Sequence, residues 1–393
     1  MLATLAAGSV LSVRTPLALS VAARAPLLRC AVRCCASESE LSALTVVKLK
    51  EKLRAAGLPV TGTKAVLVAR LLAPPPPPKP PKPPPKPRAA PRAPAAPRVV
   101  IPRDPTPAAA ASSSSSLLRV GTWNVAGLRG ALGREAARAS LLELGRMCDV
   151  LLLQETKLQT VHVADAEPAL LDALGADAGA WRAAWACSTA RKGYSGVCTL
   201  WRGAADASCA PLAVHPGHEA DDEGRTLLLE LPLAGRAPLR IVNVYTPNSG
   251  ERLQRLDFRA GADGWDARFR AAVALEGVVV GGDLNVAVGD LDFFNPEEAR
   301  MEKQAGTTPE ERASMRTTLG GLRDAFRLRH PAARGAFSYW SQRARNRPFN
   351  RGLRLDYFLV EPALEPAVAD VQIRDDLEGS DHCPVVLTLD TAA

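Results

Sequence analysis

Short apolar runs alternate with polar segments over most of the chain from Leu117 onward. Runs of four to eight apolar residues predict buried strands. We therefore expect strands at residues 118–124, 150–153, 196–201, 226–231, 239–245, 277–281, 355–360 and 385–389. Residues 134–147 instead repeat apolar side chains at helical spacing, which predicts an amphipathic helix. Strands and helices mixed in this way predict an α/β fold of layered sheets with helices outside them.

Two shorter helical patterns lie within residues 41–73, on either side of Gly57-Leu58-Pro59. We expect the second helix to start at Lys64, with Thr63 as its cap. This arrangement resembles a SAP domain, a helix–loop–helix module that binds DNA. The resemblance rests on Leu41, Val47, Leu49, Leu53, Gly57, Leu58, Gly62, Thr63, Lys64, Leu67, Val68, Arg70 and Leu71. The basic residues expected to face DNA phosphates are Lys48, Lys50, Lys52, Arg54, Lys64 and Arg70. A helical hairpin without this function is the alternative.

The segments on either side of this module have compositions that do not predict a packed core. Residues 74–107 contain 17 of the 33 Pro, interleaved with Lys and Arg, so we expect residues 74–116 to form an extended, disordered linker. Residues 1–36 are rich in Ala, Ser, Leu and Arg and contain no acidic residue, which is typical of an organellar transit peptide. We expect a plastid (chloroplast) location, with the mitochondrion or the nucleus as alternatives. A disordered tail is the other interpretation of residues 1–36.

The formal net charge of +8 is divided unevenly along the chain. Residues 41–104 hold thirteen Lys and Arg against two acidic residues, whereas residues 105–393 carry a net charge of −5. A polyanionic partner would therefore be attracted mainly by the N-terminal third. No apolar run approaches the ~20 residues of a membrane span, so we expect no membrane contact. The scattered Cys residues form no Cys-x-x-Cys pair, which favours free thiols in a reducing compartment.

Polar side chains stand at the ends of apolar strands in six segments. These are residues 122–129, 153–157, 193–197, 282–285, 354–357 and 379–384. Their side chains are carboxylates, amides and hydroxyls with a single His, and such oxygen ligands suit Mg²⁺. Zn²⁺ is not favoured, because the segments contain no cluster of His and Cys. Glu155 is the strongest candidate for a metal ligand.

In this order the six segments resemble the AP endonucleases of the exonuclease III family, within the endonuclease/exonuclease/phosphatase superfamily. The likeness runs from Leu118 to Leu389, and Asn-Val-x-Gly-Leu-Arg, Gly-Tyr-Ser-Gly-Val and Arg-Leu-Asp-Tyr narrow it to that family. It implies that residues 117–393 form an αββα sandwich of two sheets. It also implies Mg²⁺-dependent hydrolysis of double-stranded DNA on the 5′ side of an abasic site, leaving a 3′-hydroxyl and a 5′ deoxyribose phosphate. Activity as a 3′–5′ exonuclease or 3′-phosphodiesterase is consistent with the same site, and we expect a monomer.

The resemblance implies a role for each candidate residue. The metal, Mg²⁺ or Mn²⁺ in its place, would be bound or surrounded by Asn124, Glu155, Asp283, Asn285, Asp381 and His382. The catalytic residues would be Tyr245, Asp283, Asn285, Asp356 and His382. Asp283 would position and deprotonate the attacking water, and His382 would donate a hydrogen bond to a phosphate oxygen. Asp356 would hydrogen-bond His382 and fix its tautomer.

Basic and aromatic residues crowd the approach to Asp356, within an otherwise acidic domain. We interpret this run as a phosphate-binding patch, with aromatic side chains that line a pocket for an extruded sugar. The basic residues of the run are Arg343, Arg345, Arg347, Arg351 and Arg354, and the aromatic ones are Tyr339, Trp340 and Phe349. Asn248, which follows another predicted strand, is expected to contact the scissile phosphate together with Tyr245.

Four positions depart from the pattern of the family. Ala126 stands where animal members carry an Asp and bacterial members an Asn near the metal, which predicts weaker Mg²⁺ binding or a single-metal site. Leu353 replaces an aromatic residue that lines the abasic pocket of the animal enzymes. Glu251 replaces an Arg that those enzymes insert into the duplex, and Gln304 replaces an Asn. These changes bear on affinity and side activities more than on the basic reaction.

Two other functions remain as alternatives. One is another phosphodiesterase of the superfamily, acting on phosphoinositides or sphingomyelin, for which a SAP module has no evident use. The other is a non-catalytic, SAP-tethered DNA-binding protein, which would not require Glu155, Asp283 and His382. His215 and His218 have the spacing of metal ligands but no Cys partners, so we expect them in a surface loop.

Overall fold

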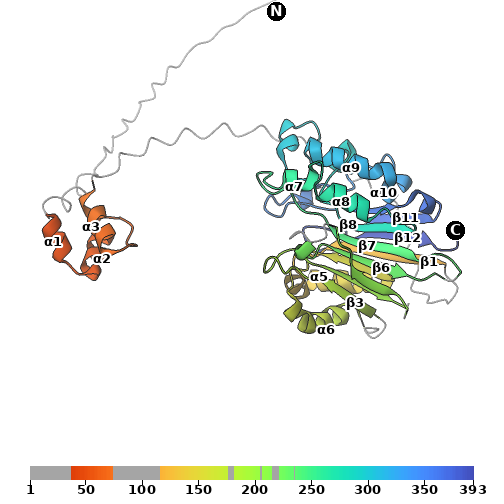
Figure 1. The fold of residues 1–393 in the computed structure, drawn as a ribbon, viewed down its shortest axis with the longest axis horizontal. Coiled ribbons are helices and arrows are strands. Elements are labelled where there is room, and N and C mark those ends of the chain that lie inside the picture. The colour runs from red at the N-terminus through yellow and green to blue at the C-terminus, as the bar shows by residue number, and fades with distance from the viewer. Residues whose placement is uncertain (1–36, 74–115, 176–180, 204–205, 215–220, 234) are drawn as a thin grey trace, which may run out of the picture. The chain divides into compact units, whose positions relative to one another are not determined.

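The computed structural model describes residues 37–73, 116–175, 181–203, 206–214, 221–233 and 235–393. The chain divides into two compact units, Met1–Ala90 and Pro91–Ala393 (Figure 1). The predicted transit peptide, residues 74–115 of the predicted linker, and the pair His215 and His218 lie outside the described residues, so these interpretations remain predictions. Within the described part of the chain, no helix has the length and apolar character needed to cross a membrane.

The described residues of the first unit, 37–73, form three helices: α1 (Glu38–Ala43), α2 (Val46–Ala55) and α3 (Lys64–Leu72). Ser37 and Glu40 form a reciprocal capping box at the start of α1. Thr63 occupies the capping position of α3 as expected, but its side chain makes no capping hydrogen bond. The helices enclose a small apolar core made of Leu41, Leu49, Leu53, Leu67 and Val68. The sequence predicted two helices here, and the structure has a third, α1. With only six residues, α1 is too short to show a helical repeat of its own.

The second unit is built on two six-stranded sheets. The first has the order β11-β12-β1-β2-β4-β3, with β1 Leu117–Asn124, β2 Val150–Gln154, β3 Trp181–Ala186, β4 Val197–Arg202, β11 Val368–Ile373 and β12 Val385–Asp390. The second has the order β5-β6-β7-β8-β10-β9, with β5 Ser208–Pro211, β6 Thr226–Leu231, β7 Leu239–Tyr245, β8 Val278–Asp283, β9 Arg323–Asp324 and β10 Asp356–Val360. Each sheet has one parallel pair near its centre, β1 with β2 and β7 with β8, and its other pairings are antiparallel.

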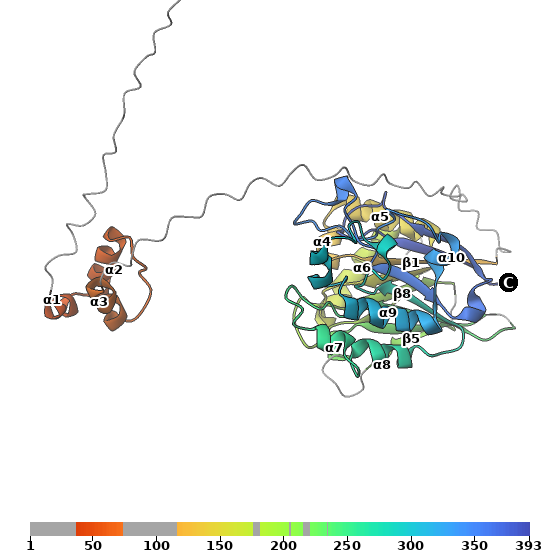
Figure 2. The same cartoon turned by 90° about the horizontal axis from the view of Figure 1, so that it is seen from above.

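Helices cover the outer face of each sheet, so the unit has four layers (Figures 1 and 2). On the first sheet lie α4 (Leu128–Leu132), α5 (Glu135–Met147) and α6 (Val163–Leu174). On the second lie α7 (Leu256–Ala260), α8 (Trp265–Ala272) and α9 (Pro309–Gly321). The short helix α10 (Ala325–Arg329) contacts β10 of this sheet and β11 of the other, and its Phe326 packs into the core between the sheets. Side chains of both sheets meet between them, including Val120, Leu152, Ile241, Val279 and Phe358, all less than 1% exposed. The predicted αββα sandwich is confirmed.

The strand directions bring the ends of several strands to one edge of the sandwich. Asn124, Tyr245 and Asp283 are the last residues of β1, β7 and β8. The antiparallel neighbour β10 begins at the same edge, where Asp356 pairs with Asp283. In the other sheet, β12 begins opposite the end of β1, a few residues after His382. Residues that are far apart in the sequence therefore converge because parallel strands end together and antiparallel strands start where their neighbours end.

Arg354, just before β10, is completely buried beneath this edge. Its Nε donates a hydrogen bond to Oδ1 of Asp292 at 2.9 Å, and its Nη2 donates to Oδ2 of Asp324 at 2.6 Å. The guanidinium also lies 4.3 Å from the centre of the Tyr357 ring. A buried cation held by two carboxylates fixes the segments around Asp292, Asp324 and Arg354 relative to one another. A direct contact between Arg354 and DNA, as the sequence predicted, does not fit this position.

Arg354→Met is expected to lower the free energy of unfolding by about 3 kcal/mol, since it leaves buried carboxylates without their cation. Denaturant unfolding followed by circular dichroism measures this loss. Arg343→Met is the matched control, because the Arg343 side chain is 93% exposed and its removal should change stability by less than about 0.5 kcal/mol. Equal stability of the two variants would contradict the role given to Arg354.

Candidate active site

A cavity of about 590 Å³ opens at the edge where the strand ends meet. Its lining includes nine residues that the sequence predicted for the site: Glu155, Tyr245, Asn248, Asp283, Asn285, Tyr339, Arg351, Asp381 and His382. Asn124 stands directly behind this lining, with hydrogen bonds to Glu155 and Asp283. The residues come from both sheets, so the site exists only when the two sheets are packed together.

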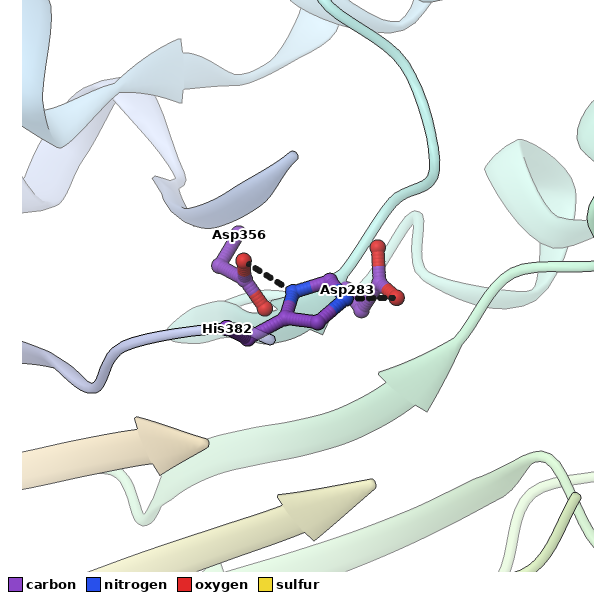
Figure 3. Close-up of side chains that lie close together, drawn as sticks. All are labelled: Asp283, Asp356 and His382. Atoms are coloured by element: carbon purple, nitrogen blue, oxygen red, sulfur yellow. Dashed lines mark hydrogen bonds and ion pairs between the residues drawn. The ribbon is translucent and has the colours of Figure 1, made fainter. Parts of the chain in front are cut away.

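Asp356, His382 and Asp283 form a buried triad in which the imidazole lies between two carboxylates (Figure 3). Nδ1 of His382 is 2.8 Å from Oδ2 of Asp356, and its Nε2 is 3.8 Å from Oδ2 of Asp283. Burial would lower the pKa of His382, but the charges of Asp356 and Asp283 outweigh burial and raise its pKa to about 10. His382 is therefore an imidazolium at neutral pH, fixed by Asp356 and able to donate from Nε2 toward the cavity.

Asp283 is held by hydrogen bonds on both carboxylate oxygens. Its Oδ2 accepts from Nδ2 of Asn124 at 2.9 Å, and its Oδ1 accepts from the backbone N–H of Asn285 at 2.8 Å. Burial raises the pKa of Asp283 to about 7, against the opposing effect of the His382 cation. A carboxylate with a pKa near neutrality is suited to accept a proton from water during the reaction.

Glu155 follows β2 and faces the same cavity. Its Oε1 accepts from Asn124 at 3.0 Å, and its Oε2 lies 2.8 Å from Nζ of Lys157. Burial opposes ionisation, but the Lys157 cation and the hydrogen bonds prevail and lower the pKa of Glu155. Glu155 is therefore an ionised carboxylate. Lys157 was missed by sequence reasoning, although its position two residues after Glu155 was visible.

Several residues at the site adopt the left-handed backbone conformation that non-glycine residues rarely adopt. Where the structure describes the chain, eight non-glycine residues have positive φ, and those in the site segments are Ala126, Glu155, Lys157, Ser195 and Asn285. Such conformations cost free energy and persist only where the surrounding structure enforces them. They turn each segment sharply as it leaves or approaches a strand, and they aim Glu155 and Asn285 into the cavity.

Tyr245 and two asparagines complete the lining next to Asp283. Burial, and then the negative charge of Glu155, raise the pKa of Tyr245, so its hydroxyl keeps its proton. Asn285 donates from Nδ2 to the carbonyl of Thr246 at 2.9 Å, and Asn248 donates from Nδ2 to Oδ1 of Asn285 at 2.9 Å. These hydrogen bonds fix the orientation of both amides and hold the loops that follow β7 and β8 together.

Arg259 and Glu311 form a buried ion pair behind these loops, which the sequence did not predict. Arg259 donates to the carbonyls of Leu284 and Asn285 at 2.6 and 2.8 Å, and to Oε1 of Glu311 at 3.1 Å. Glu311 also accepts from the Ser249 hydroxyl at 2.5 Å. The pair therefore joins loops from three parts of the chain. Glu311 is at position N3 of the capping box that begins α9, and Thr308 is its N-cap. The sequence Thr308-Pro309 was therefore a visible signal for the start of this helix.

The predicted substrate-binding residues divide into two groups. Tyr339 lines the cavity, with its ring centre 4.9 Å from that of His382, and Arg343 is exposed on the loop after α10. Trp340 is only 2% exposed, and Arg347 donates to the carbonyls of Asp375, Leu377 and Ser380. Trp340, Arg347 and Arg354 therefore support the loops of the site instead of lining its cavity.

Other polar residues lie on the cavity wall. Asn295, Arg300 and Lys303 were not singled out by the sequence, whereas Arg351 belongs to the predicted phosphate-binding run and Gln304 was noted as the replacement of an Asn. Asn295 is 7% exposed, and neither polar atom of its side chain has a hydrogen-bond partner. The Nε of Arg351 is likewise buried without a partner. Unpaired buried polar groups at a cavity are suited to bind a polar ligand.

The lining of the cavity fits a hard divalent cation. Glu155 and Asp381 contribute carboxylates, and Asn124 contacts Glu155 through its amide Nδ2 while its Oδ1 accepts from the backbone N–H of Ala126. No Cys is found among the described residues that line the cavity. Asp283, Asp356 and His382 bring their ligand atoms within 4.8 Å of one another, but Asp356 and His382 are already bonded to each other. Glu155 and Asp381, with Asn124 behind them, are therefore the best candidates for metal ligands.

The site thus combines carboxylates that can hold a metal, a fixed imidazolium and a carboxylate base. This combination is that of a metal-dependent phosphodiesterase. Residues 121–382 match the Endonuclease/Exonuclease/phosphatase family, and residues 40–73 match the SAP domain. The chain thus belongs to the Endonuclease/Exonuclease/phosphatase family, and the expected SAP module is confirmed.

Relatives and solved structures agree with this assignment. The chain is 36% identical over 280 residues to the DNA repair nuclease APEX1 of Danio rerio, covering 69% of this chain and 82% of that protein. It is 34% identical over 276 residues to an exodeoxyribonuclease of Bacillus subtilis, covering 68% and 98%. The AP endonuclease LMAP of Leishmania major is similar in structure, with a TM-score of 0.61 and 33% identity over 70% of this chain and 87% of that one.

Asp356→Asn is expected to lower the pKa of His382 toward neutrality, because it removes the largest charge that raises it. In the wild type, the raised pKa means that His382 stabilises the fold fully below pH 6.5, and that this contribution is lost as the pH rises through about 10. NMR titration of the imidazole Cε1–H signals measures the shift. Asp172→Asn, an exposed change on α6, is the control, and an unchanged His382 titration in Asp356→Asn would contradict the assignment.

Proposed function

We propose that this chain is a Mg²⁺-dependent AP endonuclease that hydrolyses the phosphodiester on the 5′ side of an abasic site in double-stranded DNA. The observation that carries this proposal is the position of Asp283, which is held between Asn124 and His382 in the cavity that Glu155 and Tyr245 also line. The relatives named as DNA repair nuclease and AP endonuclease support the same activity.

The residues of the cavity account for the attack on the phosphate. Asp283 accepts a proton from a water molecule, whose oxygen attacks the phosphorus atom. The bond between phosphorus and the 3′ oxygen breaks, and that oxygen takes a proton from a solvent water molecule to become a 3′-hydroxyl. The imidazolium of His382 and the hydroxyl of Tyr245 donate hydrogen bonds to phosphate oxygens and offset the charge that develops on them.

Glu155, Asp381 and Asn124 would hold the Mg²⁺ ion, and Mn²⁺ could replace it. The ion would stabilise negative charge on the leaving 3′ oxygen. Ala126 contributes no ligand beside Asn124, and its backbone N–H donates to Oδ1 of Asn124 at 3.0 Å. A single ion therefore suits the donor set better than a pair of ions.

The abasic sugar would enter the cavity beside Tyr339 and Leu353, which supply aromatic and apolar walls. The partnerless side chain of Asn295 would meet a polar group of the substrate there. Extruding a nucleotide without a base from a duplex costs less free energy than extruding an intact one, because it loses neither base pairing nor full stacking. The shape of the site and the energetics of extrusion thus favour the same substrate.

Asp283→Ala is expected to slow incision of a duplex that contains one tetrahydrofuran abasic analogue by at least about a hundredfold, because the proton acceptor is lost. Incision is followed on denaturing gels with Mg²⁺ and with EDTA, and duplex binding is measured in EDTA to show that the variant still binds. Asp172→Ala, on the exposed face of α6, is the control.

An Asp283→Ala protein that cuts at the wild-type rate would place the catalytic base elsewhere. Tight binding of the duplex by the wild type with no incision in Mg²⁺ or Mn²⁺ would instead support the non-catalytic DNA-binding alternative.

We further propose that the SAP unit binds DNA phosphates through exposed lysines. Lys48 and Lys52 project from α2, and Lys64 begins α3, and all three are exposed. Arg70 has a different role from the one predicted, since its Nη1 donates to the carbonyls of Pro59 and Thr61 at 2.6 and 2.9 Å. Arg70 therefore holds the loop between α2 and α3.

Replacing Lys48, Lys52 and Lys64 together by Gln should weaken duplex binding and reduce the slope of log affinity against log salt by about 3. Fluorescence anisotropy of a labelled duplex in EDTA, at several salt concentrations, measures both quantities. Glu51→Gln, on the same helix, is the control and should not weaken binding. An unchanged salt slope in the triple variant would show that the SAP lysines do not contact phosphates.

A further inference from the structure

Arg225 lies immediately before β6 and directly behind Tyr245. Its Nη1 donates to the carbonyl of Tyr245 at 2.9 Å, and the backbone N–H of Tyr245 donates to the carbonyl of Arg225 at 2.9 Å. The guanidinium carbon is 4.8 Å from the centre of the Tyr245 ring. Arg225 therefore contacts the backbone and the ring of the same tyrosine.

The rest of the Arg225 guanidinium is fixed by neighbours outside the cavity. Its Nε is 2.6 Å from Oε2 of Glu223, and its Nη2 donates to the Tyr194 hydroxyl at 2.8 Å. Arg255 holds the same two partners, with Nη1 2.6 Å from the Tyr194 hydroxyl and Nη2 3.0 Å from Oε1 of Glu223. Each edge of the planar guanidinium thus meets a different fixed group.

Burial argues against a direct contact between Arg225 and DNA. The residue is only 3% exposed, and it is absent from the lining of the catalytic cavity, whereas Tyr245 belongs to that lining. An arginine that was a phosphate ligand would need free N–H groups directed at the cavity. Arg225 instead directs its donors at Tyr245, Tyr194 and Glu223.

We propose that Arg225 is a positioning residue for Tyr245, and that Glu223, Arg255 and Tyr194 hold Arg225 in place. The guanidinium fixes the ring so that the Tyr245 hydroxyl points at the scissile phosphate. This inference rests on the proposed function, in which Tyr245 donates to that phosphate. Lysine cannot replace Arg225, because an ammonium group is not planar and cannot stack on the ring while bonding three separate partners.

A double-mutant cycle in the full chain tests this role. Arg225→Lys should lower kcat by about tenfold to a hundredfold with KM changed by less than about twofold, because a misplaced donor weakens the transition state more than binding. Tyr245→Phe should have a loss of similar size. In the Tyr245→Phe background, Arg225→Lys should lower kcat by less than about twofold, since Arg225 acts only through the missing hydroxyl.

Losses that multiply in the double variant would overturn the proposal, because Arg225 would then act independently of Tyr245. Arg240→Lys, on β7 and paired with Glu230, is the control and should leave kcat unchanged. A wild-type chain that does not cut the duplex would count against the proposed function. If the wild type does cut, and the two kcat losses multiply in the double variant, the result counts only against this inference.

A second variant keeps the test decisive if Arg225→Lys does not fold. Tyr194→Phe removes only the hydroxyl that Arg225 and Arg255 contact. It should lower kcat by less than Arg225→Lys does, and this loss should also vanish in the Tyr245→Phe background. Circular dichroism and thermal unfolding of each variant show that the folded fraction is unchanged. A loss that persists in the Tyr245→Phe background would contradict the proposal.

Discussion

The structure depends on the buried triad of Asp356, His382 and Asp283, which links the two sheets at the site. Burying a charged group is costly unless an opposite charge faces it, and the imidazolium satisfies both carboxylates. Asp356 and Asp283 are direct partners in the register of β10 with β8, so a slip of one residue would turn one carboxylate away from the cavity. Correct pairing of the strands and assembly of the site are therefore the same event.

Buried arginines support the triad and its neighbours in a domain that is acidic overall. They are Arg225, Arg259 and Arg354, joined by the half-buried Arg347, and all four bind carbonyls or carboxylates of the loops behind the cavity. A network of this kind restricts loops that carry catalytic residues, which lowers the entropy lost when the substrate binds. The other cations lie at the cavity wall and on the exposed lysines of the SAP unit, where the proposed function has them attract DNA. The proposed function thus assigns catalytic geometry and DNA attraction to different cations.

The sequence predicted the central strands and the residues at their ends, because central strands are continuous apolar runs and their polar ends stand out. The four strands that it missed, β3, β5, β9 and β11, are the edge strands of the two sheets. Edge strands are partly exposed and short, as in β5 and β9, so no apolar run marks them. The Arg run before Asp356 was assigned to DNA as a whole, because a sequence cannot distinguish an arginine that faces a carbonyl from one that faces solvent. Tertiary contacts alone separate Arg354 from Arg343.

The most direct test of the account is the chemical identity of the ends produced by the wild-type chain on a duplex with one natural abasic site in Mg²⁺. The ends are identified by mass spectrometry and by extension of the upstream strand with a polymerase. The account predicts a 3′-hydroxyl that can be extended and a 5′ deoxyribose phosphate, since Asp283 and His382 are arranged to hydrolyse the bond between phosphorus and the 3′ oxygen. A 3′ unsaturated aldehyde, formed by cleavage of the sugar on the other side of the abasic site, would contradict the account.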